Sequence, residues 1–186
     1  MEIKTKRLIL RQPIMKDAKD LINNLNNLNI SKWLAVIPYP YTIEDARWYI
    51  NHCAKKLKED KTTSYDFSIE LKSKRRIIGG CAISSIDLGQ GTANLGYWIG
   101  EKYWKKGIIK EATNELIKFS FEKLKLRRLQ IPAYSKNVAS NAVAKSLGFT
   151  FEGKLRKAII CKATGKIHDE NLWGLLKEEW EKSLKI

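Results

Sequence analysis

The clearest pattern in the chain is a change of hydrophobic period near residue 100. Leu95, Tyr97 and Ile99 alternate along the chain, which predicts a strand with one buried face. Beyond Gly107 the apolar positions recur every three or four residues, which predicts a long amphipathic helix. Its buried stripe is expected to comprise Ile109, Ala112, Leu116, Ile117, Ser120, Phe121 and Leu124. The pattern therefore predicts a strand, a short loop and a helix in succession.

The loop between this strand and this helix has the composition of an anion-binding site. It contains Trp104, Lys105, Lys106 and Gly107. The first turn of a helix presents backbone N–H groups without intrahelical acceptors, together with the positive end of the helix dipole. Glycine allows a ligand to approach the backbone closely, and the lysines add positive charge. We therefore expect a phosphate or pyrophosphate group to bind here.

The remaining segments mix strands and helices along the chain. Their periodicity predicts strands over residues 7–11, 65–71, 77–87, 128–134, 149–161 and 167–176, and helices over 17–27, 42–59, 139–147 and 178–182. This order predicts an α+β fold with a mixed sheet. An apolar, proline-containing segment over residues 29–41 is expected to be a loop. It either packs on the core or forms a lid or wall of a substrate site.

The composition indicates one domain over residues 1–186. Of the 186 residues 44% are hydrophobic, and the chain shows neither a signal peptide nor an apolar run long enough to span a membrane. The three cysteines and two histidines lack disulfide or metal-ligand spacing, so we expect a cytoplasmic protein without a metal. The net charge of +15 favours an anionic partner, such as RNA, the ribosome or a phosphorylated cofactor. A lysine-rich proteome would give the same charge.

The strand–loop–helix segment resembles motif A of the GNAT N-acetyltransferase superfamily. The matching residues run from Leu95 to Gly100 and from Tyr103 to Ala112. Further matches occur in order along nearly the whole chain and resemble the RimJ/RimL-like branch, which acetylates the N-terminal amines of proteins. They comprise Thr5–Arg11, Pro40–Thr42, Glu44–Ala46, Gly79-Gly80, Asn137–Ser140, Gly148-Phe149, Glu152–Arg156 and Glu179-Trp180. One motif alone would be weak, but an ordered series of this length is specific.

This resemblance implies an acetyl-CoA-dependent enzyme with a GNAT-type fold. That fold is a mixed, mostly antiparallel sheet of about seven strands flanked by about four helices, whose central strands, here 92–99 and 128–134, splay apart. The pantetheine arm of acetyl-CoA would pair with the strand backbone, and its pyrophosphate with the N–H groups of the loop. The residues implied in cofactor binding are Tyr97, Trp98, Ile99, Trp104, Lys105, Lys106, Gly107, Ile108, Ile109, Lys110 and Asn137.

The chain departs from the family pattern at two positions of this site. Lys105 stands where glycine is usual, and Ile109 stands where glycine or alanine is usual. Backbone N–H groups are present at both positions, so we expect the pyrophosphate site to be retained.

Acetyl transfer from a thioester to an amine needs a neutral amine, a donor for the developing oxyanion and a proton for the leaving thiolate. A backbone N–H near Tyr97 would serve the oxyanion. In the resembled branch, Asn137 would contact the cofactor arm and Ser140 would give a proton to the sulfur. Both residue types also cap helices, which is the structural alternative. Many GNAT enzymes carry a tyrosine acid later in this helix, and here Ala144 stands in its place.

The general base is not identified by the sequence. Weak candidates on neighbouring strands are Glu70, Asp87, His168 and Asp169, and a bound water is another. Cys81 and Cys161 raise the question of an acyl-cysteine intermediate, although packing is the more common role of a buried cysteine.

Three functions follow from these observations. The first is acetylation of a protein N-terminal α-amine, as in ribosomal proteins, since roughly a tenth of such amines are neutral at pH 7, against well under a thousandth of lysine side chains. The second is acetylation of a small amine, such as a polyamine, an amino acid or an aminoglycoside. The third is a non-catalytic, basic RNA- or ribosome-binding domain. Each is compatible with a monomer or a homodimer.

Overall fold

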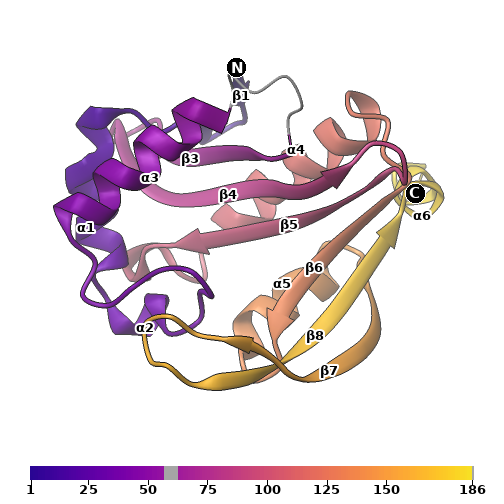
Figure 1. The fold of residues 1–186 in the computed structure, drawn as a ribbon. Coiled ribbons are helices and arrows are strands. Elements are labelled where there is room, and N and C mark those ends of the chain that lie inside the picture. The colour runs from indigo at the N-terminus through magenta and orange to yellow at the C-terminus, as the bar shows by residue number, and fades with distance from the viewer. Residues whose placement is uncertain (57–62, 186) are drawn as a thin grey trace.

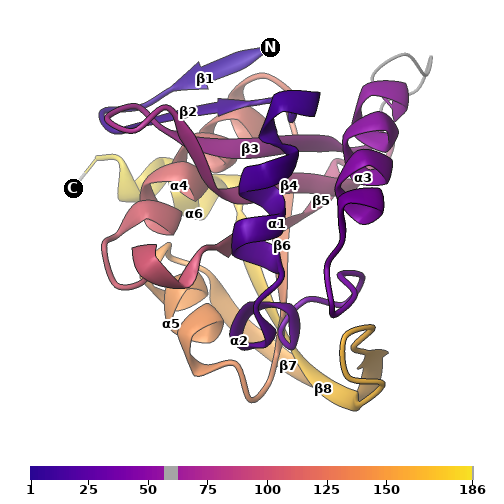
Figure 2. The same ribbon diagram turned by 90° about the vertical axis from the view of Figure 1, so that its left-hand side faces the viewer.

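The computed structural model describes residues 1–56 and 63–185. One mixed sheet carries helices on both of its faces (Figures 1 and 2). The strands are β1 (Glu2–Lys4), β2 (Leu8–Arg11), β3 (Tyr65–Leu71), β4 (Arg76–Asp87), β5 (Thr92–Ile99), β6 (Arg128–Tyr134), β7 (Thr150–Ile160) and β8 (Ile167–Leu176). The helices are α1 (Ala18–Leu25), α2 (Leu28–Ser31), α3 (Ile43–Lys56), α4 (Ile108–Glu122), α5 (Val138–Ser146) and α6 (Lys177–Ser183), with 3₁₀ turns at Met15–Asp17 and Glu101–Tyr103.

The described strands lie in the order β1-β2-β3-β4-β5-β6-β8-β7, and among them only β5 and β6 are parallel neighbours. The expected mixed, mostly antiparallel sheet is therefore confirmed. The described residues form eight strands rather than about seven, and six α-helices rather than about four. The difference lies in short elements such as β1 and α2, which are too short to show a period. The predicted helix over 42–59 is described as far as Lys56, and its last residues lie outside the described ranges.

The parallel pair in the centre of the sheet is held together only at one end. Residues 92–94 of β5 pair with residues 128–130 of β6, and in the described chain no further pair joins the two strands. Beyond this point β5 continues to Ile99 and β6 to Tyr134, and the two strands diverge (Figure 1). The predicted splay is thus present. We refer to the space between residues 95–99 and residues 131–134 as the notch.

The two faces of the sheet carry different helices (Figure 2). Helices α4 and α5 pack on one face, while α1 and α3 lie over the other. The predicted stripe of α4 is buried against the first face or packs on its core. A second, smaller core under α1 and α3 includes Leu21, Tyr41 and Ile50. The 29–41 segment contributes Leu34 and Ile37 to this second core.

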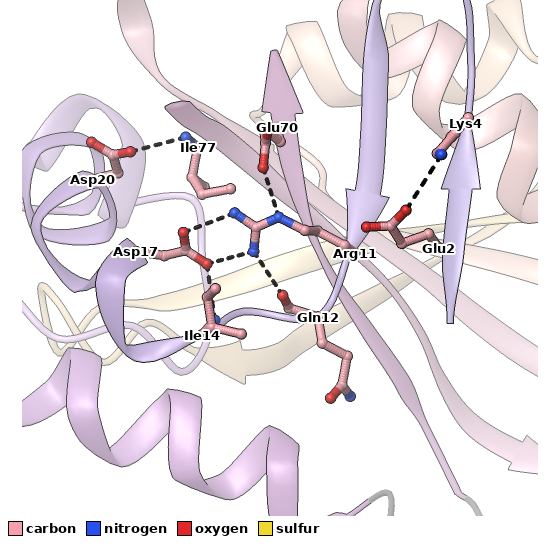
Figure 3. Close-up of polar contacts among 9 residues, drawn as sticks. All are labelled: Glu2, Lys4, Arg11, Gln12, Ile14, Asp17, Asp20, Glu70 and Ile77. Carbon is pink, nitrogen blue, oxygen red and sulfur yellow. Dashed lines mark hydrogen bonds and ion pairs between the residues drawn. The ribbon is translucent and has the colours of Figure 1, made fainter. Parts of the chain in front are cut away.

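Arg11 joins three elements on the α1 side of the sheet (Figure 3). Its guanidinium donates to the Asp17 carboxylate at 2.7 and 2.9 Å and to the Glu70 carboxylate at 2.7 Å. The hydrogen bond to Asp17 raises the pKa of Arg11 further above its usual range. Asp17 also accepts from the Ile14 backbone N–H at 2.9 Å. This cluster therefore fixes the start of α1 to β2 and β3.

Replacing Arg11 by Met should strongly destabilise the fold. The side chains of Arg11, Asp17 and Glu70 are 13%, 4% and 15% exposed, so the change leaves two poorly solvated carboxylates without their cation. We expect the free energy of unfolding to fall by about 3 kcal/mol, measured by urea denaturation. The matched control is Lys4→Met, which removes a cation from an exposed pair with Glu2 and should change stability by less than about 0.5 kcal/mol. Equal losses in the two variants would contradict the proposed anchor.

Candidate active site

The loop before α4 presents a row of backbone N–H groups beside the end of β5. Gly107 is the N-cap of α4, and its carbonyl accepts from the Glu111 N–H at 3.1 Å. Within the described chain, the N–H groups of residues 105–110 have no backbone acceptor outside the helix, and the first helical turn offers none inside it. This row of unpaired donors fits the pyrophosphate predicted from the sequence.

Two residues of this loop adopt a left-handed backbone conformation. The φ angles of Lys105 and Gly107 are 59° and 68°. A non-glycine residue in this region is disfavoured by about 1 kcal/mol, which explains why glycine is usual at the position of Lys105. Ile109, the other departure from the family pattern, is 8% exposed and packs in the core beneath α4. Its side chain therefore does not crowd the loop.

The N-terminal segment holds this loop in place. The Arg7 guanidinium donates to the Lys106 carbonyl at 2.9 Å and to the Glu111 carboxylate at 2.5 Å. The Thr5 hydroxyl, at 2.5 Å, and the Arg7 backbone N–H, at 2.9 Å, also donate to Glu111. Although burial opposes the shift, these bonds lower the pKa of Glu111 below its usual value. This role of Arg7 cannot be predicted from the sequence, because nothing in the local pattern relates it to Glu111, 104 residues away.

Tyr97 connects the two sides of the notch. It projects from β5, and its hydroxyl lies 3.1 Å from the carbonyl oxygen and 3.2 Å from the side-chain oxygen of Ser140 in α5. Burial raises the pKa of Tyr97 to about 12, so the phenol is protonated at neutral pH. Ala144, at the position of the tyrosine acid of other relatives, is fully buried in the core. A tyrosine hydroxyl thus reaches Ser140 from β5 instead, a feature that sequence reasoning missed.

Asn137 and Ser140 lie at the start of α5, as predicted. The Asn137 side-chain oxygen accepts from the Ser140 backbone N–H at 3.2 Å, so its capping role is present. Asn141, which the sequence analysis overlooked, donates to the carbonyl groups of Tyr134 at 3.0 Å and Asn137 at 2.8 Å. Its own oxygen accepts from Asn171 at 2.8 Å and from the Trp173 indole at 2.9 Å. Asn141 thereby fixes the start of α5, and with it Ser140, to β6 and β8.

Two tryptophans and a lysine at the end of β5 are held by contacts with the neighbouring backbone. The Trp104 indole donates to the Ile99 carbonyl at 3.0 Å, which ties the loop to the strand. Trp98 lies across β4, where a β-carbon added to Gly80 would come within 2.5 Å of the indole nitrogen. The Lys106 ammonium donates to the Lys102 carbonyl at 2.9 Å, which keeps its charge at the loop.

The carboxylates named as possible bases are engaged elsewhere. Glu70 belongs to the Arg11 cluster, and Asp87 accepts from the Gln90 N–H in the β4–β5 turn at 2.9 Å. Asp169 accepts from the Lys157 N–H at 2.9 Å and pairs with Lys154 at 3.0 Å. The remaining candidate, His168, stacks on Tyr134 with ring centroids 4.5 Å apart.

The cysteines do not favour an acyl-enzyme. Cys53, Cys81 and Cys161 are buried and unpaired as disulfides. Burial raises the pKa of Cys81 far above its usual value, so it is a protonated thiol and a poor nucleophile. Among residues 1–56 and 63–185 no group of His, Cys, Asp and Glu side chains could hold a metal ion, and no helix is long and apolar enough to cross a bilayer.

A pocket of about 180 Å³ opens on the α1 and α3 side of β5. Tyr97 and Trp98 line it from the strand, and Leu34 and Ile37 line it from the 29–41 segment. The same two side chains pack on the smaller core, so this segment is a loop that packs on the core and also lines a pocket. The notch thus has a row of unpaired backbone N–H groups on the α4 side and a pocket on the opposite side.

A splayed central strand pair followed by an anion site at a helix start is the architecture of coenzyme A-dependent N-acyltransferases. A model of the acetyltransferase (GNAT) domain matches residues 7–150, and the chain belongs to this family, in its RimJ/RimL-like branch. It is 32% identical over 176 residues to an uncharacterized N-acetyltransferase, p20, of Bacillus licheniformis, covering 95% of this chain and 96% of that protein.

Two further relatives bear on the activity. The ribosomal-protein-serine acetyltransferase of Escherichia coli is 37% identical over 82 residues, which cover 44% of this chain and 46% of that protein. The microcin C7 self immunity acetyltransferase MccE, solved with acetyl-CoA and AMP, superposes with a TM-score of 0.81 at 28% identity, covering 92% of this chain and 93% of that one. The protein is an N-acetyltransferase that uses acetyl-CoA as its donor.

Replacing Lys105 by Gly should stabilise the protein. Glycine adopts φ near 59° without a steric cost, so we expect the free energy of unfolding to rise by about 1 kcal/mol, while the loss of the Lys105 charge should raise the Kd for acetyl-CoA. The matched control is Lys106→Gly, which removes the same charge from a residue without positive φ and should lower stability by about 0.5 kcal/mol. Urea denaturation and calorimetry measure both quantities. A loss of stability in both variants would show that Lys105 is not strained.

Proposed function

We propose that this enzyme acetylates the N-terminal α-amine of a protein in the cytoplasm, with ribosomal proteins as the first candidates. The observation that carries the proposal is the composition of the notch, where Tyr97 and Ser140 offer protonated hydroxyls while Glu70, Asp87 and Asp169 are engaged elsewhere. Because these carboxylates are engaged elsewhere, the site favours an amine with a low pKa, and α-amines, with a pKa near 7.8, are neutral far more often at pH 7 than lysine side chains. The name of the Escherichia coli relative agrees with this acceptor.

The roles of the chain's own residues follow from their positions. The N–H groups of residues 105–110, with the charges of Lys105 and Lys106, would hold the pyrophosphate of acetyl-CoA. The backbone of Tyr97, Trp98 and Ile99 would pair with the pantetheine arm, with Trp104 fixing the end of the strand. Asn137 would contact the same arm. Acetyl-CoA supplies the activated acetyl group as a thioester.

Ser140 is the proposed proton donor to the leaving thiolate. Its hydroxyl lies 3.2 Å from the Tyr97 hydroxyl, which can orient it and return a proton to it. A backbone N–H of β5 beside the notch would stabilise the oxyanion. Tyr97 is thus proposed as a positioning residue and Ser140 as the catalytic acid.

A small amine is the second candidate acceptor. The observation in its favour is the size of the pocket, whose 180 Å³ suits a short side chain or a small molecule. We also predict contact with the ribosome through basic surface residues. The protein is expected to be a monomer or a homodimer.

Replacing Ser140 by Ala should lower kcat about 100-fold, because the leaving thiolate loses its proton donor. The Kd for acetyl-CoA, measured by calorimetry, should change less than about threefold. The matched control is Ser146→Ala in the same helix. The Ser146 hydroxyl donates to the Val143 carbonyl within its own helix, so this variant should leave kcat unchanged. An unchanged kcat in Ser140→Ala would remove this residue from the mechanism.

The acceptor is tested by incubating the purified protein and acetyl-CoA with N-terminal peptides of ribosomal proteins, polyamines and free lysine. We expect mass spectrometry to show an increment of ~42 Da on the α-amine of the peptides. The rate should rise with pH as the α-amine loses its proton near pH 7.8. Acetylation of polyamines without any peptide would end the ribosomal-protein proposal and favour the second candidate.

A further inference from the structure

The floor of the pocket beside β5 is built from small residues. Gly80, Ala82 and Gly96 line it on β4 and β5. A β-carbon added to Gly96 would meet no atom within 4 Å. The floor is therefore open above Gly96, next to the strand residues proposed to hold the pantetheine arm.

The walls of this pocket are aromatic and its charge is negative. Tyr41, Tyr49 and Trp98 supply rings, and Asp66 on β3 supplies a carboxylate. Although the chain carries a net charge of +15, no Lys or Arg of residues 1–56 and 63–185 lines the pocket. Aromatic faces combined with a carboxylate are the chemistry that binds an ammonium group. The local charge is thus opposite to that of the whole protein.

The polar atoms of the pocket are incompletely paired. The Asp66 carboxylate accepts from the Ser64 hydroxyl at 3.1 Å, while the Lys56 ammonium donates to Ser64 at 3.0 Å rather than to the carboxylate. Among the described residues no Lys or Arg forms an ion pair with Asp66. The Tyr41 hydroxyl is buried in the wall, and no residue in the described ranges hydrogen-bonds to it. Each of these oxygens can accept from a cation.

We propose that this pocket binds the ammonium group of an alkylamine arm of the acceptor. Asp66, Ala82 and Gly96 lie in one row across β3, β4 and β5. Because neighbouring strands are ~4.8 Å apart, this row spans ~10 Å. The acceptor would then carry a second, cationic amine ~10 Å from the one that is acetylated. The proposal rests on the proposed function in placing the reactive amine at the notch.

Two kinds of acceptor share this chemistry. One is a polyamine, and the other is a protein N-terminus followed closely by a basic side chain. The first comparison pairs spermidine with butylamine, which lacks the second amine. The second pairs two peptides that differ only in whether their second residue is Lys or Leu. We expect the cationic member of at least one pair to have a kcat/KM about 10- to 100-fold higher.

Asp66→Asn tests the carboxylate directly. Asparagine keeps an oxygen for the Ser64 hydrogen bond, so the fold should be retained. We expect the KM for the cationic acceptor to rise about 10- to 100-fold, with no change for its uncharged partner or in the Kd for acetyl-CoA. The matched control is Asp87→Asn, the same change in the distant β4–β5 turn, which should leave every constant unaltered. Gly96→Val, which fills the floor of the pocket, should raise the same KM.

Calorimetry with spermidine separates this proposal from the proposed function. Spermidine that binds the native protein but not Asp66→Asn would support the pocket even if no amine were acetylated. Peptide acetylation with equal kcat/KM in both members of each pair would overturn the pocket and leave the proposed function standing. The pocket proposal would also be overturned if the native protein and Asp66→Asn bound or acetylated spermidine equally well.

Discussion

The interrupted pairing of β5 and β6 is the feature on which the rest of the site depends. In the described part of the chain, residues 92–94 and 128–130 alone join these two strands, so beyond them β5 pairs there with β4 and with no second strand. Unpaired backbone groups need hydrogen-bond partners, and an extended ligand arm with amide groups can supply them. The same divergence leaves room for Tyr97 to reach Ser140 and for a pocket to open on the opposite side. The backbone groups of β5 that lack a partner on the β6 side are therefore available to bind a ligand.

Charge is distributed unequally around β5. On the α4 side, the loop combines Lys105 and Lys106 with a row of backbone donors, which suits an anionic cofactor. On the α1 side, the pocket holds Asp66 among aromatic rings, and none of the described residues that line it is basic. Two substrates of opposite charge would therefore be drawn to opposite sides of one strand, with their reactive groups meeting at the notch. The positive net charge of the chain agrees with the loop that contains Lys105 and Lys106, but it gives no indication of the acidic pocket around Asp66.

Polar contacts between distant segments hold the site residues in place. Arg7 ties the N-terminal segment to the Lys106 carbonyl and to Glu111, and Asn141 ties the start of α5 to β6 and β8. The Arg11 cluster fixes α1, the helix that covers the pocket side. Each of these side chains, Arg7, Arg11 and Asn141, has several hydrogen-bond partners. Replacing one of them should therefore change both the stability of the fold and the positions of the site residues.

Local periodicity determined much of this protein from its sequence. The alternation over β5, the stripe of α4 and the glycine before it follow from which residues can be buried and which backbone angles they can adopt. Those rules are local, so they also predicted the loop with its row of backbone donors and the place of Ser140 near the start of α5. The partners of Tyr97, Arg7, Asn141 and Asp66 were decided only by the tertiary structure. A hydrophobic period indicates that a side chain is buried or exposed, but not which segment folds against it.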